Sequence, residues 1–334
     1  MRDIMYGDAR WLDCVYGDAM AAISKASRHW IMAEPGNQII AGDFVSIEAI
    51  VLACLAGEEW KVQAFREGKF IYGLMGCEIH QLDPALANDK KWFKEHYPEE
   101  AKDGKTGELA AGYQGSLGAW LNFDSSGRHS DEKIIEIIQA WRRKHPAIVA
   151  MWRGLEQAAV EAVRYPGRET SYRDIGFAIV DQWLAMVLPN GKHIWYWKPE
   201  LRMGMPPWHK PQSEDEVYAD CRAGTCDCKP MPKLTYMAQK EGQWKRVYTY
   251  GGKLTENAVQ ATSRELLVPA ALALEDAGYS LVLKVYDELV AETRKGFGSV
   301  EEFATIMREA TTSMDWSRDW PINVDVWIGE RYKK

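Results

Sequence analysis

Two aspartates lie where an apolar strand is expected to end and a short turn to begin. Asp43 follows the mainly apolar residues 38–42, and Asp287 stands one residue after the mainly apolar run at 281–285. A buried carboxylate is costly unless it is paired or bound to a metal, so two acids at strand ends indicate a shared cation site. A single acid at such a place is more often a helix cap or a turn residue. The pair therefore indicates a cation site only in combination with the sequence around it.

A second pattern combines charge with apolar surface. Lys105, Leu109 and Tyr113 recur every four residues, and Lys102 precedes Lys105 by three. At helical spacing these side chains share one face, which presents cationic, apolar and aromatic groups in sequence. Plain core packing of Leu109 and Tyr113 is the alternative.

Three of the six cysteines are clustered, at Cys221, Cys226 and Cys228, and His209 stands twelve residues before the first of them. Together they could supply the four ligands of a tetrahedral Zn²⁺ site. Their gaps of four residues and one residue differ from the paired knuckles of most structural zinc sites, so reduced thiols are the expected state and zinc is the alternative.

The helices and strands that must position these residues are predicted to form an α+β chain. Residues 1–35 favour helix, residues 38–42 a buried strand, and a helix follows from Ile47 to a stop at Gly57. Residues 61–167 are mainly helical, with an amphipathic helix at 130–143. Residues 168–250 favour short strands and loops, with a turn at 189–191. A long helix at 255–277, closed by Gly278, precedes a tight hairpin around residues 286–288.

The bulk composition limits the class of protein. The chain has 334 residues, of which 46% are hydrophobic, enough for one large or two modest domains. It has neither an apolar run of about 18 residues nor a signal pattern, so no membrane association and a cytoplasmic location are expected. Its formal charge of −7 argues against general DNA binding, so any affinity for nucleic acid would have to come from local cations such as Lys102 with Lys105, residues 142–144, and Lys245-Arg246 with Lys253.

Four blocks, in the correct order, resemble the phage-type family A DNA polymerases, the family of bacterial DNA polymerase I. Residues 43–52 resemble motif A, residues 105–113 with the following Gln114-Gly115 resemble motif B, and Tyr286-Asp287-Glu288 resembles motif C. Residues 255–260 match a block typical of the phage members. The resemblance extends from about residue 16 to residues 329–332.

The resemblance implies a template-directed DNA polymerase with a two-metal mechanism. Asp43 and Asp287 would bridge two Mg²⁺ ions, and Glu288 would support the primer end or a metal-bound water. The implied fold is a palm with an antiparallel sheet, formed by residues 1–60 and 231–334, and a mostly helical fingers region with inserted loops at residues 61–230. Thumb and exonuclease domains are not matched in this chain.

The resemblance also assigns roles in nucleotide binding. Lys105, helped by Lys102, would neutralise the triphosphate of the incoming dNTP. Leu109 and Tyr113 would bound the nascent base pair, and Glu48 would exclude a 2′-hydroxyl. The residues implied to contact primer-template DNA are Tyr286, Lys253, Asn257 and Gln260.

Three positions depart from the family pattern. Ile50 and Ala101 stand where the family usually has arginines, and Tyr286 stands where it has histidine. Lys102 could replace the arginine missing at Ala101, but a lysine is a point charge without the bidentate fork, so nucleotide affinity could fall. Both aspartates, Lys105 and Tyr113 are kept, which favours an active enzyme.

Only 42 residues precede Asp43, so a split polymerase is expected, with a second polypeptide supplying the thumb or the 3′-5′ exonuclease. If the chain is phage-encoded, it would act in the host cytoplasm. One alternative is a catalytically weak or inactive polymerase-like subunit that binds primer-template or a partner. The three departures from the family pattern favour this alternative. A metal-dependent nuclease is a further alternative, but it gives no reason for Glu48 or for the face from Lys105 to Tyr113.

Overall fold

The computed structural model describes residues 9–206, 209 and 219–332. The chain forms two compact units, a discontinuous unit of Met1–Ile47 with Arg264–Lys334 and a continuous unit of Glu48–Ser263. The bounds at residues 60 and 230 expected for palm and fingers stay predictions. Both contain helices and antiparallel strands, which confirms the α+β class. No helix in the described ranges combines the length and the apolar character that a membrane crossing needs.

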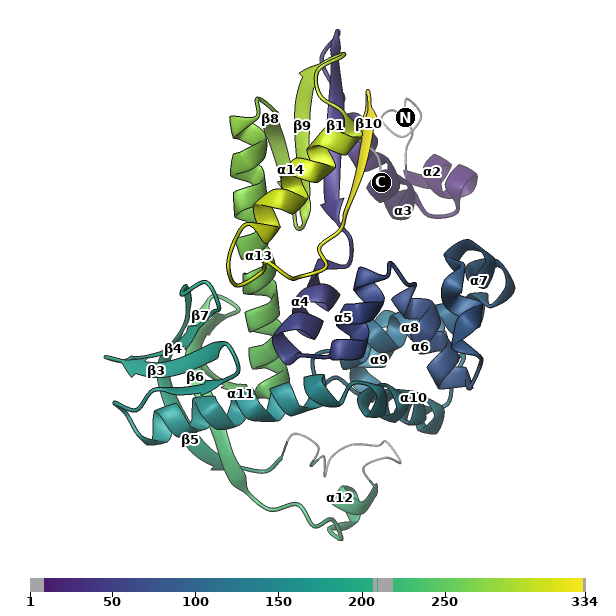
Figure 1. Cartoon of the computed structure of the whole chain (residues 1–334). Helices are drawn as coiled ribbons and strands as arrows, with labels where there is room; N and C mark the ends of the chain where they lie inside the picture. Colours follow the sequence, from purple (N-terminus) through teal and green to yellow (C-terminus); the bar gives the residue numbers. More distant parts are fainter. Residues whose placement is uncertain (1–8, 207–208, 210–218, 333–334) are drawn as a thin grey trace. The chain divides into compact units, whose positions relative to one another are not determined.

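The discontinuous unit is built on a four-stranded antiparallel sheet of order β10-β1-β9-β8 (Figure 1). Helix α14 (Val300–Thr312) packs on one face of it, where a Cβ on Gly42 would lie 2.6 Å from the sulfur of Met307. A glycine at this position lets strand and helix approach closely, one residue before Asp43. The strands are β1 (Asn37–Phe44), β8 (Ser280–Val285), β9 (Glu288–Arg294) and β10 (Val324–Gly329).

Short helices precede the sheet. They are α2 (Ala9–Tyr16), α3 (Ala19–Ser27) and the 3₁₀ turn η1 (Arg28–Trp30). This agrees with the helical expectation for residues 1–35, of which residues 1–8 lie outside the described part of the chain. The expected strand before Asp43 is β1, and the expected hairpin is β8–β9, whose two-residue turn is Tyr286-Asp287.

The first half of the continuous unit is helical, as predicted. A stop at Gly57 is observed, with φ at +69°, and the amphipathic helix at 130–143 is α10, which begins at the N-cap Ser130. The elements are α4 (Ile47–Ala56), α5 (Glu59–Arg66), α6 (Ile71–His80), η2 (Pro84–Asn88), α7 (Lys90–His96), α8 (Pro98–Ala111), α9 (Leu117–Phe123), α10 (Asp131–Lys144) and α11 (Pro146–Arg164).

Helices α6 and α8 pack backbone to backbone through glycine. A Cβ on Gly104 would lie 2.0 Å from the carbonyl oxygen of Tyr72, and one on Gly76 would lie 2.4 Å from the carbonyl oxygen of Glu100. Contacts this close leave room for hydrogen alone at both positions. The two glycines therefore set the position of α8, the helix that carries Lys102, Lys105 and Leu109.

A six-stranded antiparallel meander follows, in the order β2-β3-β4-β5-β6-β7, and α11 packs on it (Figure 1). The turn expected at 189–191 joins β4 to β5, with Gly191 at φ +80°. Strands β5 and β6, of 12 and 10 residues, are longer than the short strands expected there. The elements are β2 (Thr170–Tyr172), β3 (Ile175–Val180), β4 (Trp183–Val187), β5 (His193–Gly204), α12 (Ala219–Ala223), β6 (Met231–Lys240) and β7 (Gln243–Thr249).

The expected long helix is α13 (Gly251–Asp276), which begins four residues earlier than predicted. It ends as predicted at Gly278, which has φ at +90°. The amides of Gly278 and Tyr279 donate to the carbonyl oxygens of Glu275 and Leu274, and so satisfy the end of the helix.

Candidate functional site

Asp43 and Asp287 lie on adjacent segments of the sheet in the discontinuous unit. Asp43 pairs with Glu288 across β1 and β9, and the amide of Phe44 donates to the main-chain oxygen of Asp287 at 3.2 Å. Both aspartates are partly exposed. The strand pairing thus brings together two acids that are 244 residues apart in the sequence, as the shared cation site requires.

Asp43 and Glu288 lie on the face of the sheet opposite α14. Side chains alternate along a strand, Gly42 faces α14, and directly paired residues share a face. Further along that same face, Ile39, Ala41 and Val290 form a buried apolar cluster with Tyr332. The acids therefore stand at the end of a packed face, which holds the ends of β1 and β9 in place.

Glu288 is more buried than its expected role suggests, at 1% exposed. The hydroxyl of Tyr332 donates to one carboxylate oxygen of Glu288, and the other oxygen has no hydrogen-bond partner among the described residues. A buried oxygen of this kind is a potential acceptor for a proton or a cation.

Asp325 belongs to the same row of acids and was missed in the sequence. It pairs with Asp43 across β10 and β1, so their Cβ atoms are about 5 Å apart and share a face. Its side chain is exposed. The sequence does contain a signal for it, because Asp325 stands between Val324 and Val326 in an apolar run. The same pattern indicated Asp43.

Tyr286 forms the tip of the β8–β9 hairpin. Its side chain is 93% exposed, and its backbone is in the left-handed region with φ at +52°. A bulky residue there is uncommon, so the hairpin presents an aromatic ring and a hydroxyl to solvent next to Asp287.

The predicted face of α8 exists. Lys102, Lys105 and Leu109 are exposed along one side of the helix, and Tyr113 follows just past its end. No ion pair of Lys105 is found in the described ranges, whereas the Nζ of Lys102 lies 3.4 Å from Oδ2 of Asp124. Lys105 is therefore the more available cation of the two.

Tyr113 and Glu48 are brought together by the fold. The Tyr113 hydroxyl donates to Oε2 of Glu48 at 3.0 Å. Burial, followed by the nearby Glu48 carboxylate, raises the pKa of Tyr113 well above its ordinary value, so the phenol stays protonated and remains a donor. The two residues assigned to the base pair and the sugar thus form one hydrogen-bonded pair.

A buried polar network lies beneath α8 that sequence reasoning missed. Lys61 on α5 is fully buried and forms an ion pair with Glu108 on α8. Nε2 of His145 lies 3.2 Å from the other Glu108 oxygen, and its Nδ1 donates to the carbonyl oxygen of Trp141 at 2.8 Å. Burial raises the pKa of Glu108, but Lys61 and His145 outweigh it and lower that pKa to about 2. The network ties α5, α8 and α10 together.

The start of α13 is held against the segment after α8. The amide of Gly252 donates to the side-chain oxygen of Gln114 at 2.8 Å, and that of Gly251 donates to Oε2 of Glu156 at 3.1 Å. A Cβ on Gly252 would lie 2.3 Å from the carbonyl oxygen of Tyr113, so glycine is needed there. The fold thus joins motif B to the block at residues 255–260.

Three residues of α13 are expected to contact primer-template DNA, and they differ in their contacts within the protein. Lys253 forms an ion pair with Glu256, with Nζ and Oε1 2.9 Å apart. The Asn257 amide donates to the hydroxyl of Tyr196 on β5 at 2.9 Å, a contact that the sequence did not indicate. Gln260 is exposed.

The histidine and cysteine cluster converges in three dimensions. One ligand atom each from His209, Cys221, Cys226 and Cys228 lies within 4.8 Å of every other. The four ligand atoms are therefore close enough to one another to hold a single metal ion. The irregular sequence spacing therefore did not prevent the four side chains from meeting.

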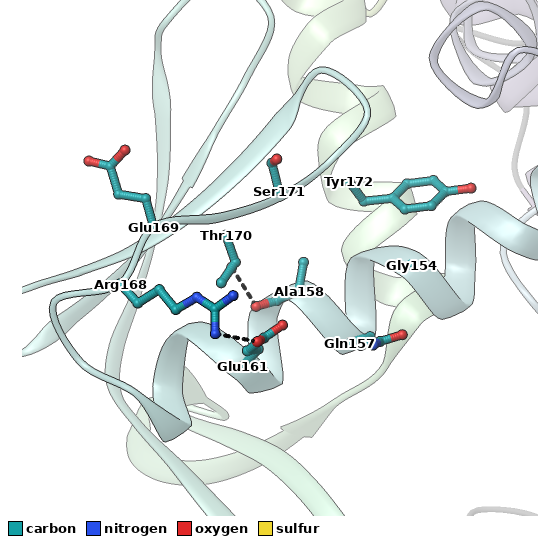
Figure 2. Close-up of a pocket in the computed structure, with 9 residues that line it drawn as sticks. All are labelled: Gly154, Gln157, Ala158, Glu161, Arg168, Glu169, Thr170, Ser171 and Tyr172. Carbon is teal, nitrogen blue, oxygen red and sulfur yellow. Dashed lines mark hydrogen bonds and ion pairs between the residues drawn. The ribbon is translucent and has the colours of Figure 1, made fainter.

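A hollow in the continuous unit is lined by none of these residues. Figure 2 shows it between α11 and β2. Its volume is about 430 Å³. Arg168 forms an ion pair with Glu161 at 2.9 Å, and the Thr170 hydroxyl donates to the carbonyl oxygen of Ala158 at 2.7 Å. These two interactions join α11 to β2 and to the segment that leads into it, at the junction between helix and sheet.

Comparison with known proteins identifies relatives. The chain is 30% identical over 325 residues to the DNA polymerase of Bacillus phage SP02, a match that covers 97% of this chain and 45% of the phage protein. Over 63 residues, or 19% of this chain and 8% of the relative, it is 41% identical to the thermostable DNA polymerase I of Thermus filiformis. The chain thus spans less than half the length of these curated relatives. No profile of a known protein family matches it.

The fold has a counterpart among solved structures. The POL domain of Pol1 from M. smegmatis, in complex with DNA primer-template and dNTP, matches with a TM-score of 0.55 at 14% sequence identity, over 91% of this chain and 42% of that chain. At this identity the likeness shows the fold. Together with the phage relative, it confirms the resemblance to phage-type family A DNA polymerases that the motifs indicate.

Proposed function

We propose that this chain is the catalytic part of a template-directed DNA polymerase, which adds deoxynucleotides to the 3′ end of a primer. The observation that supports it most is the pairing of β1 with β9, which places Asp43 next to Asp287 at the ends of adjacent segments. The relatedness to a phage DNA polymerase over nearly the whole chain supports the same activity.

The donor set at this place suits magnesium. Mg²⁺ prefers oxygen ligands and usually takes one or two carboxylates, with waters and substrate phosphates completing its octahedron. Asp43 and Asp287 supply two partly exposed carboxylates, and the buried oxygen of Glu288 adjoins them in the sheet. When bound there, two Mg²⁺ ions would lower the pKa of the primer 3′-hydroxyl and neutralise the leaving pyrophosphate.

The continuous unit contributes the groups that select the nucleotide. Lys105, exposed and without an ion pair in the described ranges, neutralises the triphosphate, and Lys102 assists it. Leu109 and Tyr113 bound the nascent base pair. Glu48, held by the Tyr113 hydroxyl, occupies the place of a 2′-hydroxyl and so excludes ribonucleotides. Contacts to primer-template DNA come from Tyr286, Lys253, Asn257 and Gln260.

The departures at Ile50 and Ala101 give weaker support to an inactive protein than the sequence alone suggested. Ile50 is 1% exposed and Ala101 is 8% exposed, so both side chains lie in the core. Lys102, one residue after Ala101, is exposed on the same side as Lys105. The positive charge expected near position 101 is thus supplied by a neighbouring residue, which supports an enzyme rather than a binding subunit.

The proposal concerns this chain alone. The chain spans 45% of the length of the phage relative. The comparisons give no support to the expected second polypeptide with a thumb or an exonuclease. Assays of this chain use primer-template in large excess.

The test is incorporation of a single nucleotide by the purified chain, with a primer-template of defined sequence and Mg²⁺. Asp43→Asn and Asp287→Asn should abolish incorporation, because each removes a charge from the metal site while keeping the shape of the side chain. Asp315→Asn, a change at an exposed acid of the same unit, is the matched control and should keep activity. Incorporation that survives both site variants would overturn the proposal, whereas DNA binding without incorporation by the wild type would favour the inactive subunit.

A further inference from the structure

The connection between β5 and β6 contains a set of side chains that the proposed polymerase chemistry does not use. His209 lies five residues after the end of β5, and Cys228 lies three residues before the start of β6. Cys221 and Cys226 lie between them, on and just after the short helix α12. Figure 1 shows α12 on the long excursion between these two strands of the continuous unit.

The four ligand atoms have nearly the separation that a tetrahedral metal site demands. Zinc bonds to sulfur at about 2.3 Å, so two sulfurs of a tetrahedron are about 3.8 Å apart. All four atoms here lie within 4.8 Å of one another, and Sγ of Cys226 lies 3.3 Å from Nδ1 of His209. A small contraction around one ion would complete the tetrahedron.

A local turn explains how cysteines with an unusual spacing meet. After α12, Gly224 adopts φ +72°, a conformation that glycine adopts readily. The amides of Thr225 and Cys226 then both donate to the carbonyl oxygen of Asp220, at 2.9 and 3.2 Å. The chain therefore folds back so that Cys226 returns to Cys221, although four residues separate them.

The chemistry of the set favours zinc over other uses of the same groups. A disulfide would use two thiols and give no role to the third or to the imidazole. A catalytic thiol with a histidine would need one cysteine, not three. Thiolate and imidazole together select zinc among the common metals, because Mg²⁺ and Ca²⁺ take oxygen ligands.

We propose that His209, Cys221, Cys226 and Cys228 bind one Zn²⁺ in a closed tetrahedral site that ties the two ends of the β5–β6 connection together. Four protein ligands leave no position for water, so the site is structural rather than catalytic. Ligands from both ends of the connection make metal binding part of its folding. The proposal is independent of the polymerase activity.

The first test is the metal content of the full chain, purified with its affinity tag removed and without chelator, and measured for all transition metals by mass spectrometry. We expect one zinc per chain. Cys226→Ser and His209→Ala should each lower the zinc content at least several-fold, while Cys14→Ser, a cysteine of the other unit, should keep it. Wild-type protein without zinc, or with iron in its place, would overturn the proposal.

A second test needs no variant and so is unaffected by misfolding. Zinc in wild-type protein is replaced by Co²⁺, which reports tetrahedral thiolate ligation through strong visible absorption and a thiolate charge-transfer band. Limited proteolysis with and without a zinc chelator then tests the structural role, and cleavage within residues 205–230 should increase when the metal is removed. A six-coordinate Co²⁺ spectrum, or proteolysis that the chelator does not change, would contradict the proposed site. Both readouts are independent of nucleotide incorporation.

Discussion

The hydroxyl of Tyr113 lies 3.0 Å from Oε2 of Glu48 and donates a hydrogen bond to it, although the two residues are 65 positions apart. The bond joins the segment after α8 to the first turn of α4. It also restricts the orientation of the exposed Glu48 carboxylate. The selection of the nucleotide sugar is therefore expected to depend on both residues.

Glu48→Ala should weaken discrimination against ribonucleotides. Removing the carboxylate opens the space that a 2′-hydroxyl would need, so the preference for dNTP over rNTP should fall at least about tenfold, or about 1.4 kcal/mol. Tyr113→Phe removes the hydrogen bond and keeps the ring, so its effect should be in the same direction but smaller. The measurement is kcat/KM for matched dNTP and rNTP opposite one template base. Glu136→Ala, at an exposed acid of α10, is the control, and an unchanged ratio in Glu48→Ala would refute the assigned role.

Lys105→Ala should raise the KM for dNTP more than Lys102→Ala does. Lys102 is already partly neutralised by Asp124, with Nζ and Oδ2 3.4 Å apart, whereas Lys105 has no such partner in the described ranges. A loss of about 1.4 kcal/mol in binding is a tenfold change, which we expect for Lys105. Saturation curves for one incoming dNTP give the values, with Lys133→Ala as the surface control. Equal effects of the two substitutions at positions 102 and 105 would contradict this ranking.

Gly104→Ala should destabilise the protein and Gly118→Ala should not. A Cβ at position 104 would lie 2.0 Å from the carbonyl oxygen of Tyr72, so α6 and α8 must separate, at a cost of about 1–3 kcal/mol or more. At Gly118, also helical, no atom lies within 4 Å, and alanine should stabilise by roughly 0.5–1 kcal/mol. Urea denaturation of the three proteins provides the free energies of unfolding. The close packing of α8 on α6 would be disproved by two variants of equal stability.

The buried network of Lys61, Glu108 and His145 should make stability depend on pH in acid. The pKa of Glu108 is lowered from 4.5 to about 2, because Lys61 and His145 outweigh the opposing effect of burial. A carboxylate that is more acidic in the folded state contributes its full stability above pH 4.5, and this contribution is lost as the pH falls towards 2. Wild-type stability should therefore decline across that interval.

Glu108→Gln isolates this contribution. It leaves Lys61 buried without its counter-charge, so the free energy of unfolding at neutral pH should fall by about 3–5 kcal/mol. Its remaining stability should decline less than that of the wild type between pH 4.5 and 2. The double variant Lys61→Met with Glu108→Gln should recover part of the loss, because the unpaired charge is gone. Denaturation curves at several pH values decide this, and parallel pH profiles for wild type and Glu108→Gln would count against it.

Features that depend on local pattern could be predicted from the sequence. The strand before Asp43, the hairpin at Asp287 and the exposed face of α8 each follow from the periodicity of a short segment and from the residue types within it. The motif resemblance added the expected order of these segments, and the phage DNA polymerase is similar over 97% of the chain.

Features that depend on long-range pairing could not be predicted. Glu108 and Lys61 are 47 residues apart, and a charged residue at an apolar helix face gives no indication of its partner. Asp325 becomes part of the acidic row because β10 pairs with β1. The four zinc-ligating candidates meet through the turn at Gly224 and the pairing of β5 with β6, neither of which is visible in their spacing.

The most direct test of the central claim is crystallographic. Crystals grown with a dideoxy-terminated primer-template, the next dNTP and Mn²⁺ in place of Mg²⁺ would locate the metal ions by anomalous scattering. We expect two peaks about 3.5–4 Å apart, each ligated by carboxylate oxygens of Asp43 and Asp287. Manganese bound elsewhere, with those two carboxylates separated from it, would contradict the proposed mechanism.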